Sequence, residues 1–182
     1  MVSDFRKKKY THVFYVFLDS DKSGSIERKD FALTATNIAK KRGYKAGETA
    51  YELIKEMLGK IWEGLIKDAD ANGDGVVTVD EWIKLWDEYA KNPAGAKEWQ
   101  KLYAKCFFQL ADVANDGTID AEEFGTVCEC FGLDKNESME SFKKLTGGKA
   151  QINFAEYEKL FQEYFTSDDV NAPGNNIFGK PK

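Results

Sequence analysis

Apolar residues recur at helical spacing along most of the chain, and short polar segments rich in Asp and Gly separate these stretches. Residues 51–65 carry an apolar stripe on one face of a long helix, and residues 154–165 repeat the pattern near the end of the chain. Comparable stripes lie on both sides of the polar segments 19–30, 70–81 and 112–123. Because such stripes have to be buried, the pattern predicts an all-α fold with one or two apolar cores.

The polar segment 70–81, called loop two below, has the side chains of a calcium-binding EF-hand loop. It fits the pattern D-x-[DN]-x-[DN]-G-x5-E at every specified position. Gly75 permits the sharp turn at the sixth place, and Glu81 at the twelfth can hold an ion with both carboxylate oxygens. The predicted ligands are Asp70, Asn72, Asp74, the backbone carbonyl of Val76, Thr78 and Glu81.

The segment 19–30, loop one, repeats this pattern but ends in an aspartate. Its predicted ligands are Asp19, Asp21, Ser23, the backbone carbonyl of Ser25, Glu27 or a water that it holds, and Asp30. Since Asp30 is one methylene shorter than a glutamate, we expect it to bind through one oxygen. That leaves about six ligands, a number that also suits the octahedral geometry of Mg2+. Loop one is therefore predicted to accept both Ca2+ and Mg2+.

The segment 112–123, loop three, lacks one ligand. Its predicted ligands are Asp112, Asp116, Thr118 through its carbonyl, Asp120 and Glu123. The third place holds Ala114, which has no side-chain oxygen. Because calcium readily retains water, a water can complete the ligand set, and we expect this loop to bind calcium. The alternative is a folded loop without an ion.

The segment 145–156, loop four, keeps the outline of the motif without its ligands. Leu145, Gly147 and Lys149 stand at the first, third and fifth places, and an ammonium group there would repel a cation. We expect no ion in this loop. Ile152 stands at the eighth place, as Ile26, Val77 and Ile119 do in the other loops. These positions are expected to pair in short antiparallel ribbons, so that loop four completes the partner of loop three.

Helix–loop–helix units of this kind are expected to pair, because a single unit cannot bury its apolar face. Asn92-Pro93-Ala94-Gly95 ends a helix and marks the boundary between two halves. We therefore expect four EF-hand units packed compactly in two pairs. Residues 1–91 would form the first pair, with loops 19–30 and 70–81, and residues 92–166 the second, with loops 112–123 and 145–156.

Net charge and cysteine content indicate few functions beyond the binding of divalent ions. The formal net charge is −5, so three divalent ions, adding about six positive charges, would bring the protein near neutrality and stabilise it. Three cysteines and a single histidine, His12, argue against a disulfide framework or a zinc site.

The absence of a leader sequence and of an apolar run long enough to span a bilayer predicts a cytoplasmic protein. We expect a monomer.

Two charged or polar stretches remain. The basic run 6–9 is too short to indicate nucleic-acid binding and is expected to form a solvated helix face. The tail, residues 167–182, is rich in Ser, Asp, Asn, Pro and Gly. It is either mobile, or Ile177 and Phe178 close an apolar opening between the two halves.

These features together resemble the invertebrate sarcoplasmic calcium-binding proteins, and within that family most closely the calexcitin branch. The resemblance covers nearly the whole chain. It rests on a first loop ending in Asp30, an intact second loop leading into Glu81-Trp82, a fourth loop without ligands, and the closing stretches Glu163-Tyr164-Phe165, Gly174-Asn175 and Phe178-Gly179. Ala114 departs from the family pattern. The resemblance implies a compact protein whose EF-hand pairs share a core.

The function implied is calcium binding without catalysis, either as a buffer or as a calexcitin-like sensor that acts on a signalling protein such as a membrane channel. The chain has only three methionines, which argues against a calmodulin-like binding groove. An alternative is storage of an apolar, coelenterazine-type ligand, or light emission from it, because photoproteins resemble the same fold. Photoproteins use several histidines, however, and only His12 occurs here.

Overall fold

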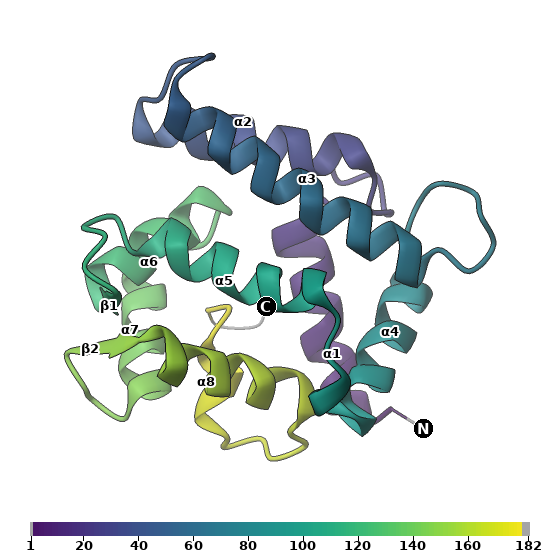
Figure 1. Cartoon of the computed structure of the whole chain (residues 1–182). Helices are drawn as coiled ribbons and strands as arrows, with labels where there is room; N and C mark the ends of the chain where they lie inside the picture. The colour runs from purple at the N-terminus through teal and green to yellow at the C-terminus, as the bar shows by residue number, and fades with distance from the viewer. Residues whose placement is uncertain (1, 180–182) are drawn as a thin grey trace.

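Helices account for most of residues 2–179, the part of the chain that the computed structural model describes (Figure 1). A π-helical turn, Phe14–Leu18, continues the first helix into loop one. The α-helices are α1 (Asp4–Val13), α2 (Arg28–Arg42), α3 (Thr49–Ala69), α4 (Val79–Lys91), α5 (Glu98–Ala111), α6 (Ala121–Cys130), α7 (Lys135–Thr146) and α8 (Phe154–Thr166). Short 3-10 turns follow α4 and α8, at Pro93–Gly95 and Pro173–Asn176. The predicted all-α EF-hand architecture is confirmed.

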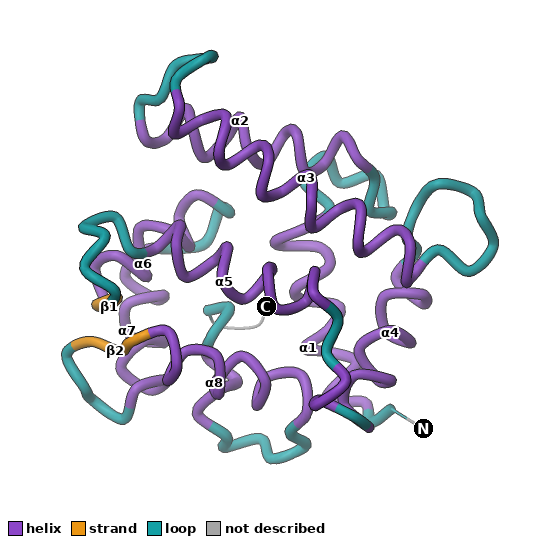
Figure 2. The backbone as a smooth tube through the Cα atoms, in the orientation of Figure 1, coloured by secondary structure: helices purple, strands orange, loops and turns teal. Residues whose placement is uncertain are grey.

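The predicted pairing between loops is also present. Strands β1 (Thr118–Asp120) and β2 (Gln151–Asn153) run antiparallel with Ile119 opposite Ile152, and they are the strands drawn in Figure 2. Loops one and two meet in a shorter contact, a single bridge in which Ile26 and Val77 exchange N–H to O bonds of 2.9 Å. All four eighth-place residues are therefore paired as predicted.

The buried hydrophobic side chains form one continuous core to which both predicted halves contribute. Trp86 of α4 stacks on Phe165 of α8 with 3.6 Å between ring centroids and 16° between ring planes. The hydroxyl of Tyr10 on α1 donates to the backbone carbonyls of both residues. Figure 1 shows α1 in the middle of the molecule, between α4 and α8. The halves thus share a core instead of having one each.

The tail adopts the packed alternative. After α8 the chain turns back toward the middle of the molecule (Figure 1), where Ile177 and Phe178 are fully buried. The ring centroid of Phe178 lies 5.1 Å from that of Phe17, 5.8 Å from that of Phe107 and 4.9 Å from that of Tyr164. Because Phe17 belongs to the first half and the other two rings to the second, Phe178 connects the halves.

The basic run at 6–9 is not the solvated face that the sequence suggests. Lys9 is 1% exposed, and its ammonium donates to the carbonyl of Ser167 at 2.8 Å and to Oδ1 of Asn175 at 3.0 Å. Arg6 pairs with Asp168 at 3.1 Å. Burial lowers the pKa of Lys9 to about 8. The expectation is wrong for these two residues because the tail folds back over α1 and brings polar acceptors with it.

The residues considered for zinc or disulfide chemistry are used in packing. Cys106 and Cys128 are buried free thiols, and burial raises the pKa of each to about 12. His12 is buried as well, with Nε2 at 3.1 Å from the carbonyl oxygen of Phe178. Thiols kept protonated in this way are poor metal ligands.

Within residues 2–179, no helix is both long enough and apolar enough to cross a lipid bilayer.

Candidate metal sites

Loop one brings three predicted ligands into one small space. Carboxylate oxygens of Asp19, Asp21 and Asp30 all lie within 4.8 Å of one another. Asp19 and Asp30 are buried, at 3% and 0% exposure. Burial raises the pKa of Asp30, and the nearby carboxylates of Asp21 and Asp19 add to the effect. Three carboxylates held this close, two of them buried and Asp21 exposed, suit a divalent cation with oxygen ligands.

Backbone N–H groups fix the orientation of these carboxylates. Asp19 accepts bonds of 2.9 Å from the N–H groups of Ser23 and Gly24. Asp30 accepts one from Asp21 at 3.1 Å and one from Glu27 at 2.7 Å. The loop backbone therefore holds the ligand oxygens of its first and last places.

Lys29, which is not among the predicted site residues, adds a positive charge to loop one. Its ammonium lies 3.0 Å from Asp21 and 3.2 Å from Glu27, two predicted ligands. The hydrogen bond from Lys29 lowers the pKa of Asp21. This contact could have been predicted from the sequence, since Lys29 directly precedes Asp30 in a segment rich in acidic residues. An ion in this loop has to compete with the Lys29 ammonium for these oxygens.

The carboxylates of loop two accept backbone hydrogen bonds in the same pattern as those of loop one. Asp70 accepts N–H bonds from Gly73 at 2.7 Å and from Gly75 at 3.0 Å, and the bond from Gly75 lowers the pKa of Asp70. Gly75 has φ of +84°, a conformation that other residues rarely adopt. The carboxylate of Glu81 accepts one N–H from Thr78 at 2.9 Å and another from Ala71 at 3.1 Å. Both ends of the loop thus supply oriented carboxylates.

The N-terminal cap of the helix that follows each loop fixes the position of the twelfth-place acid. Thr78 caps α4 and accepts the N–H of Glu81, while Glu81 accepts the N–H of Thr78, which is a capping box. Asp120 and Glu123 form the same arrangement at α6. The ninth and twelfth ligand places are thus the N-cap and the third residue of the following helix. Because of this, formation of the helix orients the carboxylate of the acid toward the loop.

Loop three keeps this arrangement despite its missing ligand. Asp112 accepts N–H bonds from Asp116 at 3.1 Å and from Gly117 at 3.0 Å. A hydrogen bond from the Thr118 hydroxyl, 2.7 Å long, lowers the pKa of Asp116. Ala114 contributes only its backbone N–H, which donates to Glu123 at 3.4 Å. The carboxylates at the first, fifth and twelfth places are still held around one loop.

Loop four holds an ion pair at the places where the other loops have ligands. The ammonium of Lys149 lies 2.5 Å from Oε1 of Glu156, and Oε2 accepts the N–H of Asn153 at 3.0 Å. The hydrogen bond from Lys149 lowers the pKa of Glu156. The sequence predicts only that Lys149 repels a cation, and not that it pairs with Glu156. The contact could have been predicted, because the fifth and twelfth places of such a loop converge on one point.

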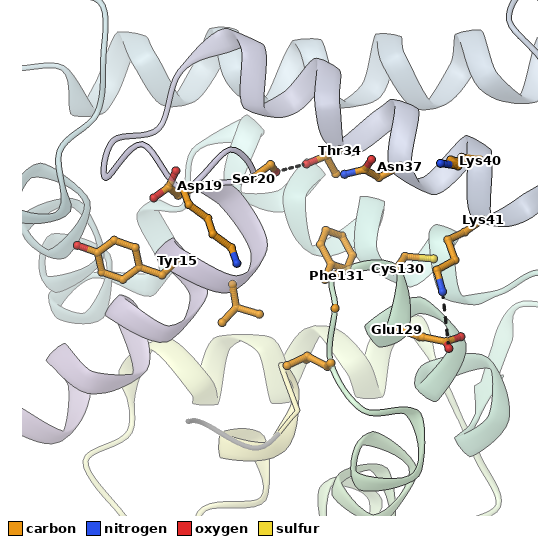
Figure 3. Close-up of a pocket in the computed structure, with 14 residues that line it drawn as sticks. Tyr15, Asp19, Ser20, Thr34, Asn37, Lys40, Lys41, Glu129, Cys130 and Phe131 are labelled. Carbon is orange, nitrogen blue, oxygen red and sulfur yellow. Dashed lines mark hydrogen bonds and ion pairs between the residues drawn. The ribbon is translucent and has the colours of Figure 1, made fainter.

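A cleft of about 1030 Å³ borders loop one (Figure 3). Lys40 and Lys41 of α2 line one wall, and Phe131, just after α6, lines the other. Lys41 spans the two walls, with its ammonium 3.7 Å from the carboxylate of Glu129. Asp19 stands at one end, so an ion in loop one would increase the positive potential of the cleft.

Comparison with known proteins gives a consistent result. The EF-hand family model matches residues 63–86 and 104–128, the segments around loops two and three. Calexcitin-1 of Caenorhabditis elegans is 30% identical in sequence, over 98% of this chain and 88% of its own length.

Solved structures share the whole fold. The sarcoplasmic calcium-binding protein from amphioxus superposes with a TM-score of 0.82 at 27% identity and covers 100% of both chains. The coelenterazine-binding protein from Renilla muelleri, in its calcium-loaded apo form, has a TM-score of 0.70 at 18% identity, over 98% of this chain and 99% of that one. At that identity the second likeness shows the fold alone.

Proposed function

Because the chain belongs to the family of sarcoplasmic calcium-binding proteins and calexcitin, and is thus an EF-hand calcium-binding protein, we propose that it buffers calcium inside the cell through loops one, two and three. The observation that carries this proposal is the shared geometry of those loops. In each, the first-place and twelfth-place carboxylates are oriented by backbone N–H groups of the same loop. Counting the ions bound per chain tests the proposal: three ions support it.

The packing between the halves favours a buffer over a sensor. A sensor exposes an apolar groove when calcium binds, whereas a buffer opens little. Here, such an opening would have to separate the Trp86–Phe165 stack and the contacts of Phe178. Large hydrophobic side chains exposed among the described residues are scattered over separate segments: Tyr15, Leu33, Leu53, Val113 and Val170. A buffer requires no protein partner, in contrast with the signalling role that the calexcitin resemblance also implies.

Storage of an apolar ligand is not proposed. Sites for such molecules have volumes of roughly 300–1,000 Å³ and enclose most of the ligand. The apolar cavity between Phe17, Leu58 and Tyr103 has a volume of about 20 Å³, room for about one water molecule. Phe178 and its aromatic neighbours fill the centre of the molecule.

We further propose that Mg2+ competes mainly at loop one, and Asp30→Glu tests this. Asp30 is fully buried, and each of its oxygens accepts a backbone N–H. A longer acid can offer both oxygens to the ion, which raises the ligand number and favours Ca2+ over Mg2+. We expect the variant to raise the Ca2+ preference of loop one by roughly tenfold, about 1.4 kcal/mol. The measurement is a Ca2+ titration in millimolar Mg2+, followed by the backbone amide of Gly24.

The amide of Gly75 in the same spectra is the internal control, because loop two already ends in a glutamate. Its calcium response should be the same in both proteins. The geometric interpretation of Asp30 fails if Mg2+ shifts Gly75 before Gly24, or if the variant discriminates no better than the wild type.

A further inference from the structure

The twelfth-place carboxylate is held in a similar way in the first three loops. One oxygen accepts the N–H of the ninth residue, and the other accepts an N–H from the second or third residue. In loop two these donors are Thr78 at 2.9 Å and Ala71 at 3.1 Å. In loop three they are Asp120 at 3.2 Å and Ala114 at 3.4 Å. The acid therefore draws the beginning and the end of each loop together.

Loop four closes by a different contact. Oε2 of Glu156 accepts the N–H of Asn153 at 3.0 Å, as in the other loops, but Oε1 lies 2.5 Å from the ammonium of Lys149. Lys149 occupies the fifth place, where loops two and three carry a predicted ligand acid. The side chain that replaces a ligand thus delivers a positive charge to the carboxylate that would otherwise bind an ion.

We propose that the Lys149 ammonium is a tethered cation that takes the role of the metal ion in loop four. It holds loop four closed at every calcium concentration and so presents β2 as a preformed partner for β1 of loop three. Lys149 is then a positioning residue for calcium binding at loop three. This inference rests on the proposed binding of an ion by loop three.

The pairing between loops three and four supports this coupling. β1 and β2 form a ladder of three residue pairs, whereas loops one and two, both predicted to bind ions, share one bridge. Ile119 and Ile152 at the centre of the ladder are buried, at 0% and 2% exposure. An ordered β2 spares loop three part of the cost of ordering β1 when an ion binds. This lower ordering cost matters most for loop three, because Ala114 leaves it one ligand short.

The expected effect is moderate, because the side chains of Lys149 and Glu156 are 62% and 35% exposed and water screens such pairs. We expect Lys149→Gln to weaken calcium binding at loop three by roughly two- to fivefold and to leave loops one and two unchanged. Lys149→Arg, which keeps the charge, should restore most of the affinity. The measurement is a calcium titration followed by the amides of Gly117, Gly75 and Gly24, one in each loop.

Lys143→Gln is the matched control. Lys143 forms an ion pair of the same length, 2.5 Å, with Glu140 on the exposed surface of the neighbouring helix α7. It should leave the affinity of loop three unchanged. The proposal is overturned if Lys149→Gln leaves the Gly117 titration unchanged, if Lys143→Gln weakens it equally, or if Lys149→Arg fails to restore it.

Hydrogen exchange in calcium-free protein separates this inference from the proposed function. Lys149→Gln should speed exchange of the β1 and β2 amides, and Lys149→Arg and Lys143→Gln should not. If Gly117 of the wild type does not respond to calcium, binding at loop three is refuted, and exchange still shows whether Lys149 closes loop four. Unchanged exchange in Lys149→Gln contradicts the tethered-cation role by itself.

Discussion

Replacing Glu81 with Gln should remove calcium binding at loop two while loops one and three keep theirs. Glu81 is the twelfth-place acid, oriented by the N–H groups of Thr78 and Ala71. A neutral amide cannot supply two anionic oxygens to the ion. Losing this clamp should weaken calcium binding at loop two by roughly a hundredfold, about 2.8 kcal/mol. The measurement is a calcium titration followed by the amide of Gly75.

Trp82 provides a second signal for the same variant, because it follows Glu81 directly and is fully buried. Its fluorescence response to calcium should shrink in Glu81→Gln. Glu98→Gln is the control, since Glu98 lies on α5 with a side chain that is 91% exposed. An unaltered Gly75 titration in Glu81→Gln would refute the assignment of this residue as a ligand.

The second large effect is expected at the tail, where Phe178→Ala should lower the free energy of unfolding by about 3–5 kcal/mol. Phe178 is fully buried, and its ring contacts aromatic rings of both predicted halves, among them Phe17 and Phe107. The truncated side chain leaves a cavity between helices that cannot all close in on it. Urea unfolding followed by circular dichroism, with calcium held constant, measures the change.

Val170→Ala is the control in the same tail, because Val170 is 66% exposed and its truncation should change the free energy of unfolding by no more than about 0.5 kcal/mol. Equal stability of Phe178→Ala and wild type would show that the tail does not hold the halves together.

Sequence alone predicted the loops and their pairing well, because ion binding and helix capping demand particular residues at fixed local spacing. Ile26, Val77, Ile119 and Ile152 were matched to one another by loop position, and the structure pairs them in that way. The start of α7 depends on local spacing in the same way, because the side chain of Asp134 accepts the N–H of Glu137, three residues on.

Contacts between distant parts of the chain were not predictable in this way. Lys9 stands in a run of four basic residues, which favours a solvated face, yet its acceptor Ser167 lies 158 residues further on. For Phe178 the composition of the tail left two alternatives, because an isolated apolar residue does not specify what it packs against. Where the tail is buried depends on how distant elements come together, since Phe178 packs against Phe17 of the π-helical turn, Phe107 of α5 and Tyr164 of α8.

Calcium titration calorimetry, with and without Mg2+, tests the central claim most directly, because one experiment gives the number of ions and their competition. We predict three calcium ions per chain at saturation, with Mg2+ affecting one of the three binding events. Two ions would contradict binding at loop three and show that Ala114 disables it. Four ions would contradict the account of loop four, in which Lys149 stands where an ion would otherwise bind.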